Sequence, residues 1–370
     1  MKVVFSIDHL YLHGGAEKVL VERANYFSDI LNYEVFIVTT EQKNKPSCYR
    51  LSDKITMIDL AVNYERAKSY LSFQNLKKIP FHFIAQIKLF YRIKPDVVLV
   101  FNYAFDFYWI PFIHKSSKKI KEYHSSQFGR NTRVNSLKNK FGNWLRDFTE
   151  RNYDAIVVLN PDEKKYFKVG SVFVIPNPVQ PTKNKAELVS NKVIAAGRIA
   201  PVKGFDRLIE AWSLIANKYP EWSLDIYGED YLNTKEQLQN QIDSLGLSNT
   251  VKFKGTVNNI TRKMCDYSIY AMTSHTECFP MVLLESLSVG LPIIAFDVPS
   301  GPRNIVTKDV DGFLVENNNI TEFANAIEVL IKNKSIRTRM GEQAKGSSAS
   351  FYVANVMLKW ERLFSVLNKN

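Results

Sequence analysis

The chain has 370 residues, with 49 lysines and arginines against 37 aspartates and glutamates, so its formal net charge is +12 at pH 7. This length suits two domains of about 100 to 200 residues each and excludes a peptide or a single small module. Hydrophobic residues make up 45% of the chain and charged residues 23%, which excludes low-complexity and collagen-like proteins.

No apolar run is long enough to cross a membrane. The two longest candidates, residues 97–113 and 278–298, are interrupted by acidic residues. The N-terminal segment reaches Asp8 before a hydrophobic region of secretory length can form. The three cysteines have no CxxC spacing, so neither a disulfide framework nor a zinc site is indicated. We therefore expect a cytoplasmic protein with reduced thiols.

Short apolar runs alternate with helical patterns in the first half. Residues 3–7 form the first run, a loop with Gly14 and Gly15 follows, and residues 16–31 repeat apolar side chains at helical spacing. Further strand-like runs lie at residues 34–40, 54–60, 96–101, 119–123 and 154–159. This alternation predicts a parallel sheet with helical crossovers.

A proline-rich segment separates this pattern from a second one. Three prolines fall between residues 176 and 181, and a polar stretch continues to residue 191, which predicts a linker. Strand-like runs then resume at residues 192–196, 223–227, 251–254, 267–272 and 291–296, with helical patterns at 205–219 and 231–245. We expect an N-terminal domain at 1–175, a linker at 176–191, a second domain at 192–348 and a C-terminal helix at 349–370 that packs across both domains.

Two glycines and two cations share one loop in the second domain. Gly197 and Arg198 directly follow a predicted strand, and Lys203 and Gly204 directly precede the next helix. Glycine lets the backbone approach a phosphate, the helix N-terminus offers free amides, and the cations neutralise charge. The loop is typical of a phosphate site, although a solvated loop can have the same composition.

A second group of candidate residues surrounds two carboxylates. Glu277 falls in a loop after a predicted strand, and Glu285 falls in the helix predicted at 281–289, for which Pro280 suits the first turn. Carboxylates placed in this way can accept hydrogen bonds from sugar or ribose hydroxyls, while the amides of residues 279–282 point at an anion. Two glutamates eight residues apart arise easily by chance, so the interpretation depends on the predicted strand, loop and helix around them.

These motifs, in this order, resemble glycosyltransferase family 4 over almost the whole chain. The matching stretches are His-Gly-Gly-Ala-Glu-Lys-Val at 13–19, Ile-Pro-Asn-Pro-Val at 175–179, Gly-Arg-Ile-Ala-Pro-Val-Lys-Gly at 197–204, Glu277-x7-Glu285, Gly-Leu-Pro-Ile-Ile-Ala at 290–295, Gly-Pro at 301–302 and Asp-Gly-Phe-Leu-Val at 311–315. The resemblance implies the GT-B fold, in which two doubly wound α/β Rossmann-like domains face each other across a cleft. It also implies a retaining transferase that takes a sugar from a nucleotide donor, for which we expect a UDP-sugar.

The resemblance assigns roles to the matching positions. Arg198 and Lys203 would hold the donor diphosphate and stabilise its charge as it leaves. Glu277 would bind a hydroxyl of the donor sugar, and Glu285 would bind the ribose. Further donor contacts are implied for the glycine loops and the turn before the helix: Gly14, Gly15, Gly197, Gly255, Val257, Phe279, Pro280, Met281 and Val282.

Three further positions bear on the chemistry. His124 follows a strand after which such enzymes often place a histidine near the transferred sugar, although a lone histidine more often satisfies a structural hydrogen bond. Cys278 stands where the family commonly has glycine, and its Cβ would crowd the donor sugar. No cofactor or metal is expected, because Asp309-Val-Asp311 matches an Asp-x-Asp metal motif but is predicted as a turn before a strand.

Positive charge is concentrated in the first half. Residues 1–180 carry a net charge of +10, and residues 181–370 carry only +2. Residues 66–95 contain seven basic side chains and no acidic one, interleaved with aromatics, and residues 115–146 have a similar character. Such segments suit an anionic lipid surface, so we expect membrane docking through Lys77, Lys78, Lys88 and Arg92. The alternative is an ordinary solvated helix face, and nucleic acid is not expected because no recognition motif accompanies the charge.

The sequence thus predicts a retaining hexosyl- or N-acetylhexosaminyltransferase, peripheral at the inner face of the cell membrane. Its acceptor would be a glycan or a lipid-linked molecule in bacterial-type surface polysaccharide or glycoconjugate synthesis. One alternative is another GT-B activity, such as a sugar-nucleotide epimerase or a phosphorylase. The other is a non-catalytic subunit that binds a sugar nucleotide or a membrane. A dinucleotide oxidoreductase is disfavoured, since no Gly-x-Gly-x-x-Gly follows Ile7.

Overall fold

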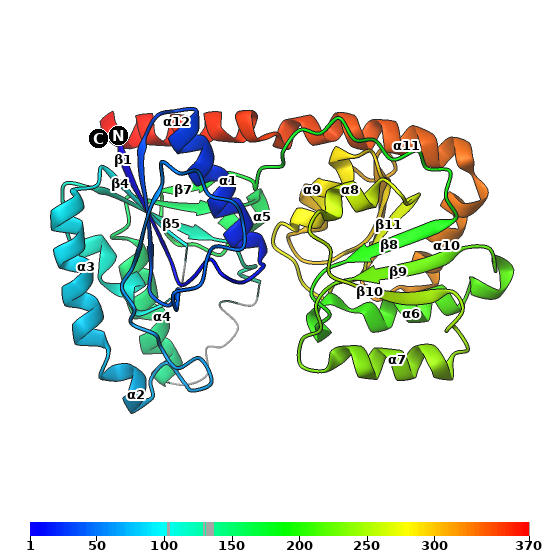
Figure 1. The fold of residues 1–370 in the computed structure, drawn as a ribbon, viewed down its shortest axis with the longest axis horizontal. Helices are drawn as coiled ribbons and strands as arrows, with labels where there is room; N and C mark the ends of the chain where they lie inside the picture. Colours follow the sequence, from blue (N-terminus) through cyan, green and yellow to red (C-terminus); the bar gives the residue numbers. More distant parts are fainter. Residues whose placement is uncertain (102–103, 129, 131–136, 370) are drawn as a thin grey trace. The chain divides into compact units, whose positions relative to one another are not determined.

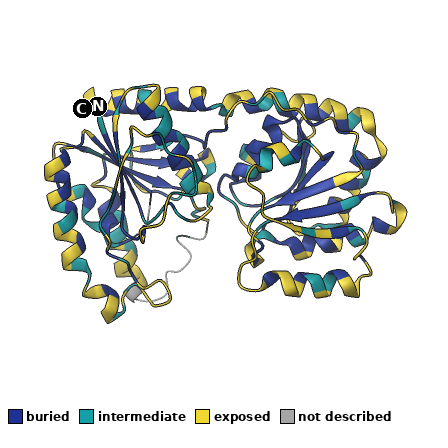
Figure 2. Ribbon diagram, viewed as in Figure 1, coloured by how far each residue is buried: buried dark blue, intermediate teal, exposed yellow. Residues whose placement is uncertain are grey.

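The computed structural model describes residues 1–101, 104–128, 130 and 137–369. They form two compact units, one of Met1–Ile175 with Met357–Asn370 and one of Pro176–Val356. Each unit is a parallel sheet with helices on both faces (Figure 1), and Figure 2 shows that the strands are buried while the helices expose one side. The prediction of two doubly wound Rossmann-like domains is confirmed.

The first unit contains a seven-stranded parallel sheet in the order β3-β2-β1-β4-β5-β6-β7. Strands β4 and β6 are buried at every position. Such strands are continuous runs of Val, Ile and Leu because helices cover both faces of the sheet. The strand bounds are β1 (Lys2–Ile7), β2 (Glu34–Thr39), β3 (Thr56–Asp59), β4 (Val97–Val100), β5 (Lys118–Tyr123), β6 (Ala155–Val158) and β7 (Val172–Val174).

Among the described residues, helices α1 to α5 and two 3₁₀ turns accompany this sheet, together with the end of the C-terminal helix. Helix α1 buries Val19, Leu20, Ala24 and Phe27, the apolar residues whose spacing predicted it. Helix α3 buries Phe90 in a cluster with the strand residues Val98 and Val100. The bounds are α1 (Gly15–Asp29), α2 (Phe73–Leu76), α3 (Ile79–Ile93), η1 (Phe105–Tyr108), η2 (Ile110–Phe112), α4 (Leu137–Glu150) and α5 (Pro161–Lys164).

The second unit contains a six-stranded parallel sheet in the order β10-β9-β8-β11-β12-β13. Strands β8 and β9 have the predicted limits, because each is a short run with buried side chains after its first residue. The strand bounds are β8 (Lys192–Ala196), β9 (Ser223–Tyr227), β10 (Val251–Gly255), β11 (Ile269–Met272), β12 (Ile293–Asp297) and β13 (Gly312–Glu316).

Two groups of helices cover the second sheet. The first group, α6, α7 and α10, shares one large apolar cluster with the strands, and the second group, α8, α9 and α11, packs together on the other face (Figure 1). The bounds are η3 (Pro201–Lys203), α6 (Phe205–Ser213), η4 (Ala216–Lys218), α7 (Thr234–Ser244), α8 (Ile260–Met264), α9 (Met281–Ser288), η5 (Pro302–Asn304), α10 (Ile320–Lys332), α11 (Lys334–Ser347) and η6 (Ser348–Phe351).

The C-terminal helix α12 (Val353–Lys369) begins in the second unit, and from Met357 onward it belongs to the first. Trp360 and Phe364 are buried, and the Phe364 ring lies 5.7 Å from Phe27 of α1. No helix among the described residues is long and apolar enough to cross a membrane.

The segment before and within the proline-rich region is more ordered than its composition suggests. Residues 172–174 form the edge strand β7, which the neighbouring prolines concealed in the sequence. Residues 176–191, for which a linker is predicted, pack with the second unit. There Ala186 and Leu188 are buried, and the Ala186 amide donates to the Val289 carbonyl at 2.8 Å.

Candidate active site

The order of strands creates a binding edge in the second unit. Strand β8 lies between β9 and β11. The chain proceeds from β8 through β9 to β10 in one direction across the sheet, and from β11 through β12 to β13 in the other. In such sheets ligands bind beyond the carboxyl ends of the strands at this switch point. The loop after β8 carries the predicted cations, and the loop after β11 carries Glu277.

Gly204 fixes the loop after β8 against the end of β11. Its φ is +60°, and an added Cβ would lie 2.2 Å from the carbonyl oxygen of Thr273, so both the conformation and the close approach require glycine. The Thr273 hydroxyl donates to the Gly204 carbonyl at 2.7 Å, and Arg207 donates to the Thr273 carbonyl. The two loops at the switch point are therefore held together.

Lys203 and Glu277 meet across this switch point. The Lys203 Nζ lies 2.7 Å from Glu277 Oε1, and the two side chains are 27% and 11% exposed. A partly exposed ion pair of this kind contributes little to stability. It does bring a cation and a hydroxyl acceptor to one point of the binding edge, so the structure joins two residues that the sequence placed on separate loops.

The backbone of Glu277 is held by the loop after β12. Ser300 pairs with Glu277 in an isolated bridge, and its hydroxyl donates to the Glu277 carbonyl at 3.3 Å. A Cβ on Gly301 would lie 2.6 Å from the Glu277 Cβ, so only glycine fits there. Gly301 of the Gly-Pro motif, together with Ser300, thus holds Glu277 in position.

Arg198 lies on the same loop as Lys203 but is exposed. Its guanidinium carbon is 5.2 Å from the centre of the Tyr231 ring, which follows β9. This distance suits a cation–π contact that holds the side chain over the binding edge. Gly197 begins the loop, and its amide donates to the Tyr227 carbonyl at 3.0 Å.

Glu285 is buried in α9, with 3% of its surface exposed. It lies near Tyr270, whose pKa is raised by burial and further by the negative charges of Glu285 and Glu277. The Tyr270 hydroxyl donates to the Ala196 carbonyl at 3.1 Å, at the end of β8. The negative charges of both predicted carboxylates therefore act on the same buried tyrosine, which lies beside the switch point.

The turn into α9 is tightly packed. Phe279, Pro280 and Met281 are buried and Val282 is half-buried. The Asn177 amide donates to the Phe279 carbonyl at 3.2 Å, which joins the Pro-Asn-Pro motif to this turn. Cys278 is also buried and does not have a positive φ, so a side chain is accommodated at the position where the family commonly has glycine.

Gly255 is the last residue of β10 and Val257 follows it, two strands away from β8 at the same edge of the sheet. Gly255 has a φ of +70° and no atom within 4 Å of an added Cβ, and its carbonyl accepts the Gly228 amide at 2.9 Å. Val257 is 39% exposed. The space around Gly255 and the exposure of Val257 leave this loop accessible to a ligand at the edge of the candidate site.

Gly14, Gly15 and His124 lie in the first unit, at the carboxyl edge of its own sheet. Gly14 is the N-cap of α1, and Gly15 is its first residue. His124 follows β5 and stacks on Phe101, with 4.6 Å between the ring centroids. Burial lowers the pKa of His124, although Glu122 beside it acts in the opposite direction.

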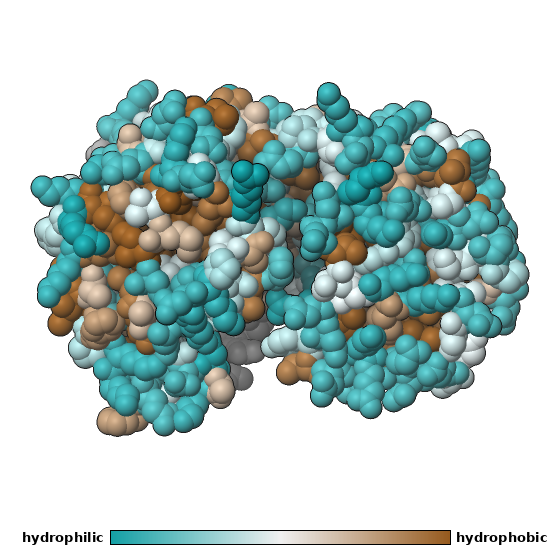
Figure 3. Space-filling view, viewed as in Figure 1, coloured by the Kyte–Doolittle hydropathy of each residue, from teal (hydrophilic) through white to brown (hydrophobic). Residues whose placement is uncertain are grey.

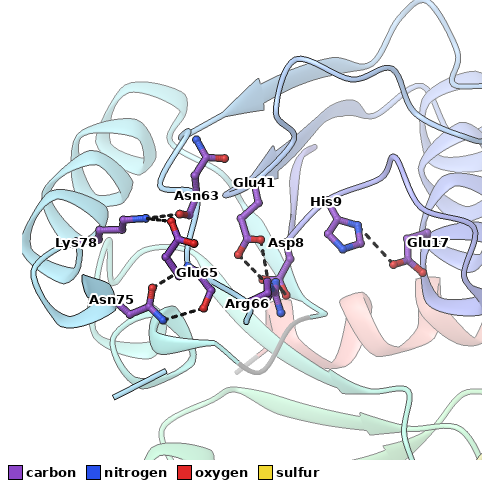
Figure 4. A network of polar contacts seen from close by, with 9 residues as sticks. All are labelled: Asp8, His9, Glu17, Glu41, Asn63, Glu65, Arg66, Asn75 and Lys78. Atoms are coloured by element: carbon purple, nitrogen blue, oxygen red, sulfur yellow. Dashed lines mark hydrogen bonds and ion pairs between the residues drawn. The ribbon is translucent and has the colours of Figure 1, made fainter. Parts of the chain in front are cut away.

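A polar network at this edge escaped the sequence analysis (Figure 4). The Arg66 Nε donates to both carboxylate oxygens of Glu41 at 3.0 and 3.2 Å, and Arg66 also pairs with Asp8. Asp8 and Glu41 follow β1 and β2, so one arginine joins two neighbouring strand ends. Burial raises the pKa of Glu41, and Arg66 opposes this rise.

The candidate lipid-facing cations differ in their surroundings. Lys77, Lys88 and Arg92 are exposed on α2 and α3, whereas Lys78 donates to the Asn63 carbonyl and lies 3.9 Å from Glu65 (Figure 4). Apolar side chains on the same helices flank these cations, and the following are exposed: Phe73, Leu76, Phe81, Phe83, Ile84 and Tyr91. Figure 3 shows hydrophobic surface over this part of the first unit.

The Asp-x-Asp sequence forms a turn. Asp309 has a φ of +64° and its amide donates to the Gly312 carbonyl at 2.8 Å, while buried Asp311 accepts the Thr307 amide at 2.8 Å. The described residues contain no group of three or more His, Cys, Asp or Glu arranged to hold a metal ion.

Comparison with known proteins gives two adjoining family matches. Residues 13–183 match the model described as Glycosyltransferase Family 4, and residues 178–347 match the model described as Glycosyl transferases group 1. An uncharacterized glycosyltransferase of Haemophilus influenzae is 28% identical over 97% of this chain and 99% of that protein. A poly(glycerol-phosphate) alpha-glucosyltransferase of Bacillus subtilis is 27% identical over 68% of this chain, which spans 42% of that protein.

A solved structure resembles both units. The crystal structure of a TarM mutant from S. aureus, in complex with fondaparinux, alpha-GlcNAc-glycerol and UDP, has a TM-score of 0.78 at 16% identity, covering 98% of this chain and 99% of that chain. This likeness confirms the predicted fold class. Together with the family matches and the relatives, it supports a glycosyltransferase.

Proposed function

We propose that the protein is a retaining glycosyltransferase that moves a hexosyl or N-acetylhexosaminyl group from a UDP-sugar to a glycan or lipid-linked acceptor. The product would belong to a surface polysaccharide or glycoconjugate. The observation that carries the proposal is the Lys203–Glu277 contact of 2.7 Å at the switch point of the second sheet. There a cation for a diphosphate and an acceptor for a sugar hydroxyl stand side by side.

The charges of the loop suit the departing group. In the transfer, the bond from the anomeric carbon to the diphosphate breaks, a bond to the acceptor oxygen forms, and the acceptor proton leaves with the diphosphate. Negative charge grows on the diphosphate as this happens, so Arg198 and Lys203 would stabilise the transition state more than the ground state. Glu277 would orient the sugar by accepting a hydroxyl hydrogen bond, and Glu285 would bind the ribose.

Relatives and the solved neighbour support the choice of donor and the stereochemistry. The B. subtilis relative is named as an alpha-glucosyltransferase, and the TarM structure contains UDP together with an alpha-GlcNAc compound. UDP-hexoses carry their sugar in the α configuration, so an α product requires retention. We therefore infer retention and UDP for this chain as well.

Metal-independent transfer is part of the proposal. Two side-chain cations are available on one loop, and Asp311 already accepts the Thr307 amide in its turn. Turnover should therefore persist in EDTA. If EDTA abolished turnover and added manganese restored it, Asp309 and Asp311 would instead be assigned a role in binding the metal.

Donor binding is tested by thermal shift with a panel of nucleotide sugars, because a ligand that binds only the folded state raises its stability. One UDP-sugar should raise the unfolding temperature, and UDP should then be released on turnover. Released sugar phosphate or an epimerised donor would favour a phosphorylase or an epimerase. If a nucleotide sugar bound but was neither transferred nor hydrolysed, the result would favour a non-catalytic subunit.

We also propose that the first unit docks on the anionic lipids of the inner face of the cell membrane. The exposed aromatics of α2 and α3 alternate with Lys77, Lys88 and Arg92, the arrangement that suits a lipid interface. A triple substitution of these cations by glutamine should weaken co-sedimentation with anionic vesicles, as should raising salt from about 0.05 to 0.5 M.

Lys78 provides the matched control for this experiment. It belongs to the same basic segment but is bonded to Asn63, so Lys78→Gln alone should leave vesicle binding nearly unchanged. The triple variant should keep the thermal shift with the donor, because the donor site is assigned mainly to the second unit. Equal binding to neutral and anionic vesicles would contradict the docking proposal.

A further inference from the structure

Four side chains of the first unit form a contact chain that ends at His124. His124 Nε2 lies 3.2 Å from Glu122 Oε2, and Arg23 Nη1 donates to Glu122 Oε1 at 2.6 Å. The Arg23 guanidinium carbon is 4.0 Å from the centre of the Trp360 ring. Glu122 and His124 lie at the end of β5 and just after it, and Arg23 and Trp360 come from α1 and the C-terminal helix α12, so no local sequence pattern connects all four.

The partners determine where the neutral imidazole carries its proton. Burial alone would raise the pKa of Glu122, but Arg23 and His124 more than offset this, so Glu122 stays ionised and can only accept hydrogen bonds. His124 therefore donates from Nε2. The other charged groups acting on it are Arg23 and Lys121, and both disfavour a second proton on the ring.

The other ring nitrogen is left as an acceptor. With Nε2 protonated, Nδ1 has a lone pair, and it is buried without a hydrogen-bond partner among the described residues. Stacking on Phe101 fixes the plane of the ring, with 12° between the two rings. A buried acceptor without a partner costs free energy, so its retention points to a donor that arrives with a ligand.

We propose that Glu122 is a positioning residue that holds His124 in the Nε2–H tautomer and so presents Nδ1 as a hydrogen-bond acceptor to a hydroxyl of the transferred sugar. Arg23 keeps Glu122 ionised, and Trp360 covers Arg23 from the side of α12. This inference rests on the proposed function and on the resemblance to family 4, which implies that His124 lies near the transferred sugar.

The tautomer is measured directly by NMR of the protein labelled with ¹⁵N-histidine at neutral pH. His124 is assigned by the loss of its resonances in His124→Gln, and long-range ¹H–¹⁵N correlations identify the protonated nitrogen. The wild type should show the Nε2–H tautomer alone. Glu122→Gln should give a mixture, because a glutamine amide can either accept from Nε2 or donate to it. An Nδ1–H tautomer in the wild type, or an unchanged tautomer in the variant, would overturn the proposal.

A second variant covers the case in which Glu122→Gln does not fold. Removing Glu122 alone leaves Arg23 charged and buried without its carboxylate, which is strongly destabilising. The double variant Arg23→Met with Glu122→Gln removes both charges and places a flexible apolar side chain beneath Trp360. It should show the same mixed tautomer, and a pure Nε2–H form would count against the proposal.

The kinetic test asks whether Glu122 acts through His124. Glu122→Gln should lower kcat/KM about tenfold, the worth of one ordinary hydrogen bond, and should have almost no further effect in a His124→Ala background. Equal losses in both backgrounds would show that Glu122 acts independently of His124. That result would overturn the positioning role.

Glu150→Gln is the matched structural control. It breaks another buried ion pair of the same unit, in which Arg130 Nη2 lies 2.6 Å from Glu150 Oε1. Glu150 contacts Tyr123, which faces the opposite side of β5 from Glu122 and His124, so the variant should lose stability but keep the His124 tautomer and kcat/KM. If the wild type turns over no nucleotide sugar, the proposed function and the sugar contact fail together, while the NMR result still decides whether Glu122 sets the tautomer.

Discussion

The two units share a topology but use their binding edges differently. In each sheet the order of strands reverses next to the first strand of the unit: β4 lies beside β1, and β11 lies beside β8. At the second edge, Lys203 meets the carboxylate of Glu277, and Arg198 on the same loop is exposed beside Tyr231. At the first edge, Arg66 forms ion pairs with Asp8 and Glu41, and Glu122 forms an ion pair with Arg23.

This difference indicates a division of labour. Among the described residues, the second edge has Arg198, which is exposed and for which no ion pair is found, available for an anion in addition to the paired Lys203. At the first edge, Arg66 is shared by two carboxylates and Arg23 is paired with Glu122. The net charge of +10 in residues 1–180 does not contradict this, because several of its cations lie on the outer helices α2 and α3. Charge at a strand edge and charge on an outer helix therefore have to be judged separately.

The largest effect is expected from removing the cations of the second edge. Lys203→Ala and Arg198→Ala should each reduce turnover by at least about 10²-fold, because each removes charge stabilisation that develops on the leaving diphosphate. Steady-state kinetics of the folded variants measures this. Lys235→Ala, an exposed cation on α7, serves as the matched control and should keep turnover near the wild-type rate. Near-normal turnover of both loop variants would remove the phosphate role from this loop.

The predictability of the fold follows from the burial of parallel strands. β8 and β9 are short runs set between polar segments, so their limits could be read directly from the sequence. Helix ends were harder to predict. The helix expected at 205–219 ends at Ser213 and is followed by the 3₁₀ turn η4. The prediction was too long because apolar residues such as Ile215 continue the helical pattern beyond the last regular turn.

The candidate residues of the second unit were visible because each group is contiguous in sequence. The Arg66 network was not, since Asp8, Glu41 and Arg66 are far apart in the chain and meet only through the order of strands. Arg66 was counted as part of a basic lipid-facing segment, whereas it is bonded to two carboxylates. A run of like charges thus predicts an unpaired surface only when no acidic residue from a distant part of the chain pairs with it.

Arg66→Met tests whether the first edge depends on charge pairing for stability. Without the guanidinium, buried Glu41 loses its ion-pair partner beside Asp8, so we expect a loss of about 1 to 2 kcal/mol in the free energy of unfolding. Urea unfolding at pH 7.5 measures it. Arg92→Met, which removes an exposed arginine of α3, should stay within about 0.5 kcal/mol of the wild type. Equal effects of the two variants would show that the network does not stabilise the unit.

Glu285→Ala tests the ribose role at the second edge. A ribose contact is the same in the ground and transition states, so its loss should raise the donor KM about tenfold and change kcat less. Because Glu285 is buried, the thermal unfolding of the variant is compared first, and Glu285→Gln separates loss of charge from loss of volume. An unchanged KM in a folded variant would move Glu285 out of the site.

The smallest effect concerns the pH dependence of stability. Burial lowers the pKa of His124 in the folded protein, so the unfolded chain takes up a proton at higher pH than the folded chain does. Stability must then fall as the pH drops through the ordinary histidine pKa, near 6.5. His9, His82, His114 and His275 are also lowered by burial and contribute to the same fall, so the total slope does not identify His124.

The difference between the wild type and His124→Gln isolates this contribution. Glutamine does not titrate, so the variant should lose less stability between pH 7.5 and 5.5, with a slope that differs by at most one proton, about 1.4 kcal/mol per pH unit. Unfolding curves at a series of pH values measure the two slopes. Parallel curves would mean that His124 binds its proton equally well in both states. The carboxylate of Glu122 would then compensate fully for burial, and the first edge would hold a histidine as easily protonated as one in water.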